Sequence, residues 1–189
     1  GLRLILAAGA IGALPWRSAI LRRVIAHNLS VDPFSKVIQI YWHGGEPLLA
    51  GIDFFRAIIG LEARYPELSF VNRIQTNGTL MTDEMARFLT EYQFQVGFSL
   101  DGPQEIHDRY RRWRGSQSGS YEAARRGIEC YRSCAGVDRV AVIAVVTRAG
   151  IGRASDLFSF FKELRAEVQL DIYDMRWLDL IPEAGQGSG

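Results

Sequence analysis

The amino-acid sequence predicts one α/β domain built on a parallel sheet. β-rich runs alternate with segments whose apolar residues recur at helical spacing, which is typical of parallel α/β folds. The run 140–146 is apolar throughout, which indicates a strand buried on both faces, as in a barrel or a doubly wound sheet. A chain of 189 residues that is 48% hydrophobic can form one such core and has little room for a second.

The alternation resolves into five strands and five helices. We expect strands at 37–42, 70–74, 94–100, 139–146 and 168–173. We expect helices at 15–28, 54–61, 82–92, 120–134 and 157–164. Pro15 suits the first position of a helix, and Thr82 should cap the third helix because acidic residues follow it in the first turn.

Composition limits the partners and the compartment that we expect. The chain carries 22 basic and 21 acidic residues, so its overall charge favours neither nucleic acid nor an anionic membrane. Two cysteines are too few for a disulfide framework, so we expect a cytoplasmic protein. The apolar stretch 2–14 is shorter than the roughly 20 residues that span a membrane. We expect a chain truncated at both ends, with a ragged start at 1–14, a core at 15–181 and a flexible Gly/Ser-containing tail at 182–189.

Polar motifs that contain glycine follow three of the expected strands. They are His43-Gly44-Gly45-Glu46-Pro47, Gln75-Thr76-Asn77-Gly78-Thr79 and Ser99-Leu100-Asp101-Gly102-Pro103. In parallel α/β folds ligands bind at the carboxyl ends of the strands, so the three motifs should form one polar cleft. Taken separately, each is an ordinary turn, and Asp101 could simply cap a turn or the helix that follows.

The first motif has the chemistry of a cation site. Adjacent glycines let a ligand approach the backbone and leave carbonyl oxygens free to accept bonds from an ammonium group, while Glu46 adds a negative charge. The alternative is a tight turn in which Glu46 opens the next helix. Further along, four arginines lie within 109–114, and one near the cleft could clamp a carboxylate. His107 beside them is either a local hydrogen-bond partner or a proton carrier.

Four ordered segments, at 42–51, 75–80, 97–103 and 107–111, resemble the radical S-adenosylmethionine (SAM) enzymes. The sequence is most similar to the anaerobic sulfatase-maturating enzymes and related peptide-modifying enzymes with a C-terminal SPASM domain. This resemblance implies a partial (β/α)6 TIM-like barrel that holds SAM against a [4Fe-4S] cluster. It also implies hydrogen abstraction from a peptide or protein side chain by a 5′-deoxyadenosyl radical, with an electron donor such as flavodoxin or ferredoxin.

The resemblance assigns a role to each candidate site residue. The amino group of SAM would be bound by Gly44, Gly45 and Glu46. The ribose would contact Ser99, and the carboxylate would contact Arg111. His43 would face cofactor and substrate. Gln75 and Asn77 would line the same interior of the barrel. Asp101 would support the loop after the third expected strand.

The cysteine-rich parts of the family pattern, the cluster loop and the C-terminal domain, are absent from the sequence. The family's Cys-x3-Cys-x2-Cys loop follows the first barrel strand, but residues 7–14 contain no cysteine. Cys130 and Cys134 have the spacing of the first two ligands, yet the third position is Val137. We interpret this pair as structural or incidental thiols on one face of a helix, and we predict no metal site. The predicted fold is a partial barrel lacking its first strand and cluster loop, and the chain alone is expected to be inactive.

Two other functions compete with this interpretation. A degenerate barrel could bind a peptide or a nucleotide without catalysis. A doubly wound nucleotide-binding domain is disfavoured, because no phosphate loop of the type G-x-G-x-x-G or G-K-[ST] follows any expected strand.

Overall fold

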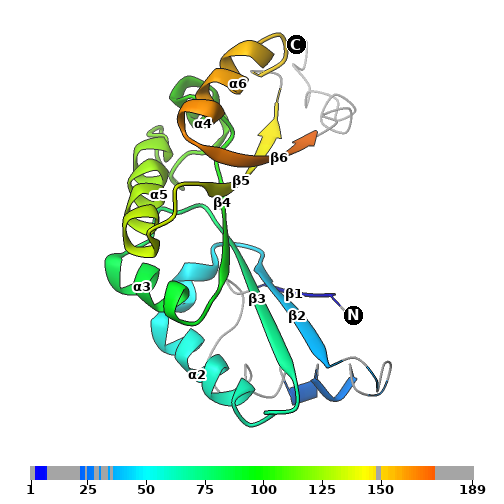
Figure 1. Cartoon of the computed structure of the whole chain (residues 1–189). Coiled ribbons are helices and arrows are strands. Elements are labelled where there is room, and N and C mark those ends of the chain that lie inside the picture. The colour runs from blue at the N-terminus through cyan, green and yellow to red at the C-terminus, as the bar shows by residue number, and fades with distance from the viewer. Residues whose placement is uncertain are drawn as a thin grey trace, which may run out of the picture.

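Six parallel strands form one curved sheet in which the spatial order of the strands is their order in the sequence (Figure 1). The computed structural model describes residues 3–7, 22–23, 25–27, 30, 34, 36–147 and 150–172, with backbone alone for 3–7 and 172. The strands are β1 (Arg3–Ala7), β2 (Val37–His43), β3 (Ser69–Thr76), β4 (Gln95–Ser99), β5 (Val140–Val146) and β6 (Ala166–Ile172). Because every neighbouring pair is parallel, all the strands end at the same edge of the sheet.

Helices cover the convex face of the sheet, and none of the helices labelled in Figure 1 lies on the concave face. They are α2 (Ile52–Glu62), α3 (Asp83–Glu91), α4 (Gln104–Tyr110), α5 (Tyr121–Ala135) and α6 (Ala154–Glu163), with a 3-10 turn, η2 (Pro47–Ala50), before α2. Alternate strand residues point to opposite faces, so Ile38, Ile40 and Trp42 of β2 are buried on the helical side. No helix among the described residues has the length and hydrophobicity to cross a membrane.

Aromatic rings form the core behind β2. The Trp42 ring meets Phe54 and Phe55 of α2 edge to face, with ring centroids 5.3 and 5.9 Å apart. Phe55 in turn meets Phe94 at 5.7 Å. The indole Nε1 of Trp42 donates a hydrogen bond to Asn72 at 2.8 Å, so its polar atom is satisfied. This packing fixes the end of β2 immediately before the first glycine motif.

The five predicted strands are all present, with ends that differ from the predicted ones by a few residues. The cap of α3 is confirmed, because Thr82 Oγ1 accepts a hydrogen bond from the backbone N–H of Met85 at 3.2 Å. Much of the helix predicted at 15–28 lies outside the described residues, but residues 22–23 and 25–27 are helical. The alternation of apolar patterns was therefore sufficient to place the main strands and helices.

The prediction that the first strand is missing was wrong. Arg3–Ala7 forms β1, which pairs in parallel with β2 and places Ala7 opposite His43. The apolar residues of 2–14 neither alternate with polar ones nor end at a turn residue, so the sequence pattern gave no strand signal. Pairing with β2 supplies the backbone partners that define the strand. The predicted position of the cluster loop was 7–14; its first residue ends β1, and residues 8–14 lie outside the described part of the chain.

The contact of α5 with the loop after β3 depends on Gly127. A β-carbon at this position would lie 1.9 Å from the carbonyl oxygen of Gly78, which belongs to the backbone and cannot rotate away. Alanine is favoured over glycine inside a helix by about 1 kcal/mol, but we expect the clash to cost about 3 kcal/mol. Gly127→Ala should therefore lower the free energy of unfolding by about 2 kcal/mol, measured by urea denaturation. The control is Gly60→Ala in α2, where no described atom beyond the neighbouring residues and the backbone of the helix itself lies within 4 Å of the added carbon. Equal stability of the Gly127→Ala and wild-type chains would contradict the close contact.

Candidate functional site at the carboxyl edge of the sheet

The loop after β2 contains two adjacent glycines with left-handed backbone conformation. Gly44 and Gly45 have φ angles of 90° and 63°, which a side chain would strain. None of the described residues donates a hydrogen bond to the carbonyl oxygen of either glycine. The loop therefore offers two carbonyl acceptors at the end of β2, which are suitable partners for an ammonium group.

Glu46 is a buried carboxylate that joins this loop to the next strand. Its Oε1 accepts hydrogen bonds from the Thr76 hydroxyl at 2.6 Å and from the Leu48 N–H at 3.1 Å. Its Oε2 accepts one from the Asn77 N–H at 2.8 Å, and the residue is 8% exposed. Glu46 therefore caps η2, as the turn interpretation predicted, and it also holds together the loops after β2 and β3. Oε2 has one protein donor and retains capacity for a second.

Gln75 and Ser99 meet on the concave side at the ends of β3 and β4. Gln75 Nε2 donates to Ser99 Oγ at 3.0 Å, so the hydroxyl proton of Ser99 is not used in this bond. A β-carbon on Gly97 would lie 2.4 Å from Gln75 Oε1, so the glycine leaves room for this side chain. Asn77 has a different task, because its Oδ1 accepts bonds from the Thr79 N–H and hydroxyl at 2.9 and 2.8 Å. The Asn77 side chain therefore shapes its own loop.

Arg111 is held by Asp101. The guanidinium donates from Nε to Oδ2 at 2.6 Å and from Nη2 to Oδ1 at 2.9 Å, which is a bidentate pair. Asp101 is 4% exposed, and its Oδ1 also accepts the Val145 N–H at 3.0 Å. This carboxylate anchors Arg111 to β5, which agrees with the supporting role expected of Asp101. The Arg111 side chain is 30% exposed, and Nη1 takes no part in the pair.

His107 is a buried hydrogen-bond partner. Its Nδ1 accepts the Asp101 N–H at 3.3 Å, and its Nε2 lies 3.1 Å from Ser120 Oγ. The Ser120 hydroxyl donates to the carbonyl oxygen of Arg111, so the hydrogen-bond network assigns the ring proton to Nε2. Burial is the largest cause of the lowered pKa of this imidazole. The structure thus favours the local role over the proton carrier.

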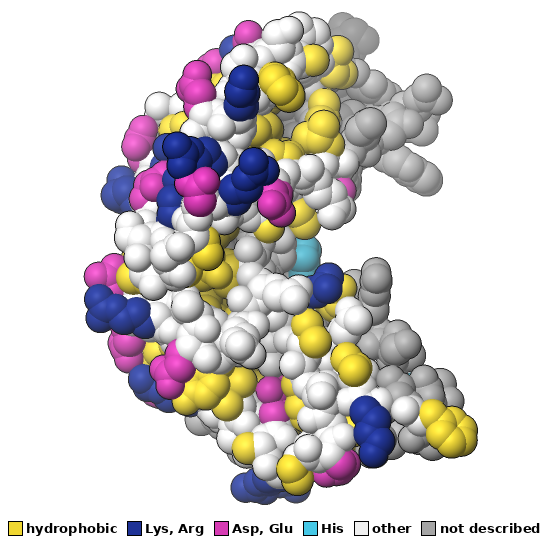
Figure 2. Space-filling model, in the orientation of Figure 1, with side chains coloured by type: hydrophobic (Ala, Val, Ile, Leu, Met, Phe, Trp, Pro, Cys, Tyr) yellow, Lys and Arg dark blue, Asp and Glu magenta, His cyan; other side chains and the backbone are white. Residues whose placement is uncertain are grey.

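A hollow of about 290 Å³ lies on the concave face of the sheet and is lined by residues of β2 to β6. The space-filling view is indented on that side (Figure 2). His43 and Gln75 line it. Tyr41 and Arg73 line it as well; Arg73 Nη1 donates to the tyrosine hydroxyl at 2.9 Å, and the guanidinium lies 5.2 Å from the same ring. This pair was not predicted from the sequence, although the alternation of side chains along β2 and β3 puts both residues on the concave face.

The eight predicted site residues share one edge of the sheet but fall into three groups. The first group forms the linked loops after β2 and β3, the second faces the concave side, and the third is a single anchored arginine. The groups are Gly44, Gly45, Glu46 and Asn77; then His43, Gln75 and Ser99; then Arg111. The predicted meeting of the motifs at one edge is therefore observed.

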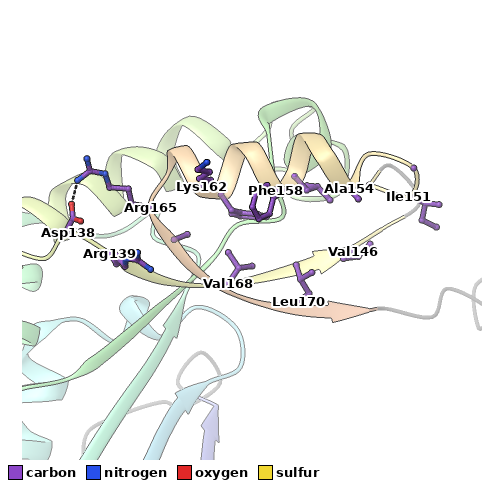
Figure 3. Close-up of a pocket in the computed structure, with 15 residues that line it drawn as sticks. Asp138, Arg139, Val146, Ile151, Ala154, Phe158, Lys162, Arg165, Val168 and Leu170 are labelled. Carbon is purple, nitrogen blue, oxygen red and sulfur yellow. Dashed lines mark hydrogen bonds and ion pairs between the residues drawn. The ribbon is translucent and has the colours of Figure 1, made fainter.

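A larger hollow, of about 940 Å³, lies on the opposite face of the sheet between α6 and the last two strands (Figure 3). Apolar side chains such as Phe158, Val168 and Leu170 point into it, and the ion pair of Arg165 with Asp138 lies at one end. It contains none of the predicted site residues. The outer face of a strand in such folds packs against other chain segments, so we interpret this hollow as a packing surface.

An open parallel α/β barrel with a polar, glycine-containing carboxyl edge defines a class of protein that binds its ligand at that edge. The family model of the Radical SAM superfamily matches residues 21–149, which is more than half of the chain. The chain therefore belongs to the radical SAM superfamily, a family of enzymes.

Several of the proteins that are similar in sequence to this chain are sulfatase-maturating enzymes. The chain is 39% identical over 124 residues to a serine-type anaerobic sulfatase-maturating enzyme of Bacteroides thetaiotaomicron, covering 65% of this chain and 29% of that enzyme. It is 47% identical over 73 residues to a cysteine-type enzyme of Clostridium perfringens, covering 38% and 20%. A solved structure, native anSMEcpe with bound AdoMet and Cp18Cys peptide, matches with a TM-score of 0.77 and 26% identity over 90% of this chain and 50% of that one. The matched segments thus cover less than a third of the length of these two curated relatives.

Proposed function

We propose that the chain is the SAM-binding barrel of an enzyme that modifies a side chain of a peptide or protein, in the manner of the sulfatase-maturating enzymes. The family assignment supports SAM chemistry, and the names of the relatives support a protein substrate. The similar solved structure contains both AdoMet and a peptide. In this proposal the barrel core comprises the predicted range 15–181 together with β1 (Arg3–Ala7), which pairs with β2 in the same sheet.

The observation that carries the proposal is the loop of Gly44 and Gly45 beside Glu46. Two carbonyl oxygens without described donors and a carboxylate with remaining acceptor capacity fit the amino group of an amino acid. Three hydrogen bonds already fix Glu46, so the loop is formed before any ligand arrives and little ordering entropy opposes binding.

The other candidate residues fit the remaining parts of SAM. The Ser99 hydroxyl proton is available for a ribose oxygen, and Arg111 Nη1 is available for a carboxylate while Asp101 holds the rest of the guanidinium. His43 and Gln75 line the hollow in which cofactor and substrate would meet. In this family, bound SAM supplies hydrogen abstraction by a 5′-deoxyadenosyl radical, and the residues named here bind and orient it.

The chain has residues that fit SAM, but it lacks the cysteine ligands that a [4Fe-4S] cluster needs. Its two cysteines both lie on α5, behind the sheet, and residues 1–129 contain no cysteine. We therefore propose that residues 1–189 bind SAM and substrate but do not catalyse the reaction alone. The complete activity, including electron transfer from a donor such as flavodoxin or ferredoxin, would require cluster ligands that these residues do not supply.

SAM binding tests the proposal directly. We expect the untagged 189-residue chain to bind one SAM in isothermal titration calorimetry, and to form no 5′-deoxyadenosine when dithionite is added. Ser99→Ala should weaken binding about fivefold, because it removes one hydrogen bond of about 1 kcal/mol. Arg111→Lys should weaken it about tenfold, because the planar fork that contacts both Asp101 and a carboxylate is lost.

The matched control is Arg114→Lys, since Arg114 is exposed and lies in the same arginine-rich run. It should bind SAM as the wild-type chain does. Tighter binding of ATP than of SAM would favour the degenerate nucleotide-binding barrel. Equal SAM affinity in the Arg111 and Arg114 variants would contradict the assignment of Arg111.

A further inference from the structure

Three ligand-type side chains come together behind the sheet, outside the candidate site. The two cysteine sulfurs of α5 and a carboxylate oxygen of Asp83 all lie within 4.8 Å of one another. Cys130 Sγ donates a hydrogen bond to Asp83 Oδ1 at 3.1 Å. Both cysteines are free and partly buried, while Asp83 is exposed. The group is therefore open to a small solute from solvent.

The helices explain why these residues meet. Cys130 and Cys134 are four residues apart, so α5 presents both sulfurs on one face. Asp83 is the first residue of α3, where the Thr82 cap fixes the helix start. The close approach of Gly127 in α5 to Gly78 holds α5 near the N-terminal end of α3. Sequence spacing alone could not reveal the third residue, because it comes from a different helix.

The chemistry of the three groups selects a particular class of ion. Thiolates prefer soft or borderline metals, and two thiolates with one carboxylate leave a fourth tetrahedral position for water. Ligand atoms around a tetrahedral zinc ion lie about 3.5–3.8 Å apart. The observed limit of 4.8 Å thus requires movements of about 1 Å, which side-chain rotation can supply.

We propose that Cys130, Cys134 and Asp83 form a binding site for one divalent cation of the zinc class. On binding, each thiol releases its proton to solvent and the sulfur donates an electron pair to the metal. The three ligands then carry three negative charges against two on the ion. Arg87 Nη2 lies 3.6 Å from Asp83 Oδ2, which is the carboxylate oxygen that does not accept from Cys130. Its positive charge offsets the remaining negative charge.

This proposal replaces our interpretation of the cysteines as incidental thiols. They still lack the third cysteine of a cluster motif, since that position is Val137. The third ligand is instead a carboxylate, which suits a single zinc-class ion rather than an iron-sulfur cluster. In the metal-free chain, burial and the Asp83 carboxylate raise the pKa of Cys130 to about 12, so this thiol stays protonated.

Cobalt binding provides the test. We expect the untagged, reduced 189-residue chain to bind one Co²⁺ and to develop a thiolate-to-cobalt charge-transfer band that Zn²⁺ abolishes. Because the chain has only two cysteines, such a band can arise only from this pair. Cys130→Ser and Cys134→Ser should each weaken Co²⁺ binding roughly a hundredfold, and Asp83→Asn roughly tenfold. Circular dichroism checks that each variant is folded.

The matched control is Glu84→Gln, because Glu84 is an exposed acidic neighbour of Asp83 in the same helical turn. It should bind Co²⁺ as tightly as the wild-type chain. Absence of the charge-transfer band in the wild-type chain, or wild-type affinity for Co²⁺ in either serine variant, would overturn the proposal. So would half a metal ion per chain in a dimer, because the ion would then bridge two molecules. Equal affinity of the Asp83→Asn and wild-type chains would remove the carboxylate from the site.

Discussion

We expect replacement of Glu46 by alanine to destabilise the chain by about 4 kcal/mol and to abolish the proposed binding of SAM. The carboxylate is buried and accepts three hydrogen bonds, two from backbone N–H groups and one from the Thr76 hydroxyl. Alanine leaves these donors without their acceptor, and each buried donor without a partner costs about 1–3 kcal/mol. Urea denaturation measures the loss of stability, and calorimetry measures SAM binding.

Glutamine at the same position separates the charge of Glu46 from its shape. The amide oxygen of glutamine can still accept hydrogen bonds, but the amide nitrogen takes the place of the other carboxylate oxygen. This nitrogen is a donor, and it must face other donors, either the Asn77 N–H or the Thr76 hydroxyl and the Leu48 N–H. We expect Glu46→Gln to cost about 2 kcal/mol, half the effect of alanine. The control is Glu67→Gln, since Glu67 is exposed and should tolerate the change. Wild-type stability of Glu46→Ala would show that the three hydrogen bonds contribute little.

The positions of the three strand-end motifs could be predicted from the sequence because they follow from local patterns. Apolar runs and helical periodicity place β2, β3 and β4, and parallel strands carry the residues that follow them to one edge. The short helix α4 was not predicted, since only two of its seven residues are buried and no apolar period is visible. Local pattern thus located the edge of the sheet but not every segment around it.

Partners that join distant segments could not be predicted in this way. The sequence pattern around Glu46 gave no indication of its hydrogen bonds to Thr76 and Asn77, which lie about thirty residues further along the chain. Asp83 and Cys130 are 47 residues apart and meet only because α3 packs against α5. Such pairs depend on the tertiary packing of elements, which no single sequence pattern contains.

A second large effect is expected at Glu62, whose carboxyl group is buried beneath the sheet. Asn72 Nδ2 lies 3.0 and 3.1 Å from its two oxygens, and no described cation pairs with it. Burial raises the pKa of Glu62 from 4.5 to about 7, against the opposing effect of the Asn72 hydrogen bond. Between these two pH values the folded chain holds a proton that the unfolded chain has released.

The free energy of unfolding must therefore fall as the pH rises through this window. The loss is about 1.4 kcal/mol per pH unit and about 3 kcal/mol in total, and it is complete above the folded pKa. Glu62→Gln keeps an oxygen that can accept from Asn72 and carries no charge at any pH. We expect this variant to match the wild-type chain near pH 4.5, where both side chains are neutral in the folded protein, and to exceed it by about 3 kcal/mol at pH 8.

Urea denaturation at several pH values measures this difference, and Glu67→Gln again provides the control. Glu67 is exposed, so its variant should follow the wild-type dependence on pH. The free energy of unfolding of Glu62→Gln could instead differ from that of the wild-type chain by the same amount at every pH from 5 to 8. The carboxyl group of Glu62 would then have to be ionised across that range. Water or a cation would then have to reach Glu62, because a buried charge without such a partner is unstable. If the free energy of unfolding falls with rising pH more steeply for the wild-type chain than for Glu62→Gln, Glu62 is the group that releases the proton.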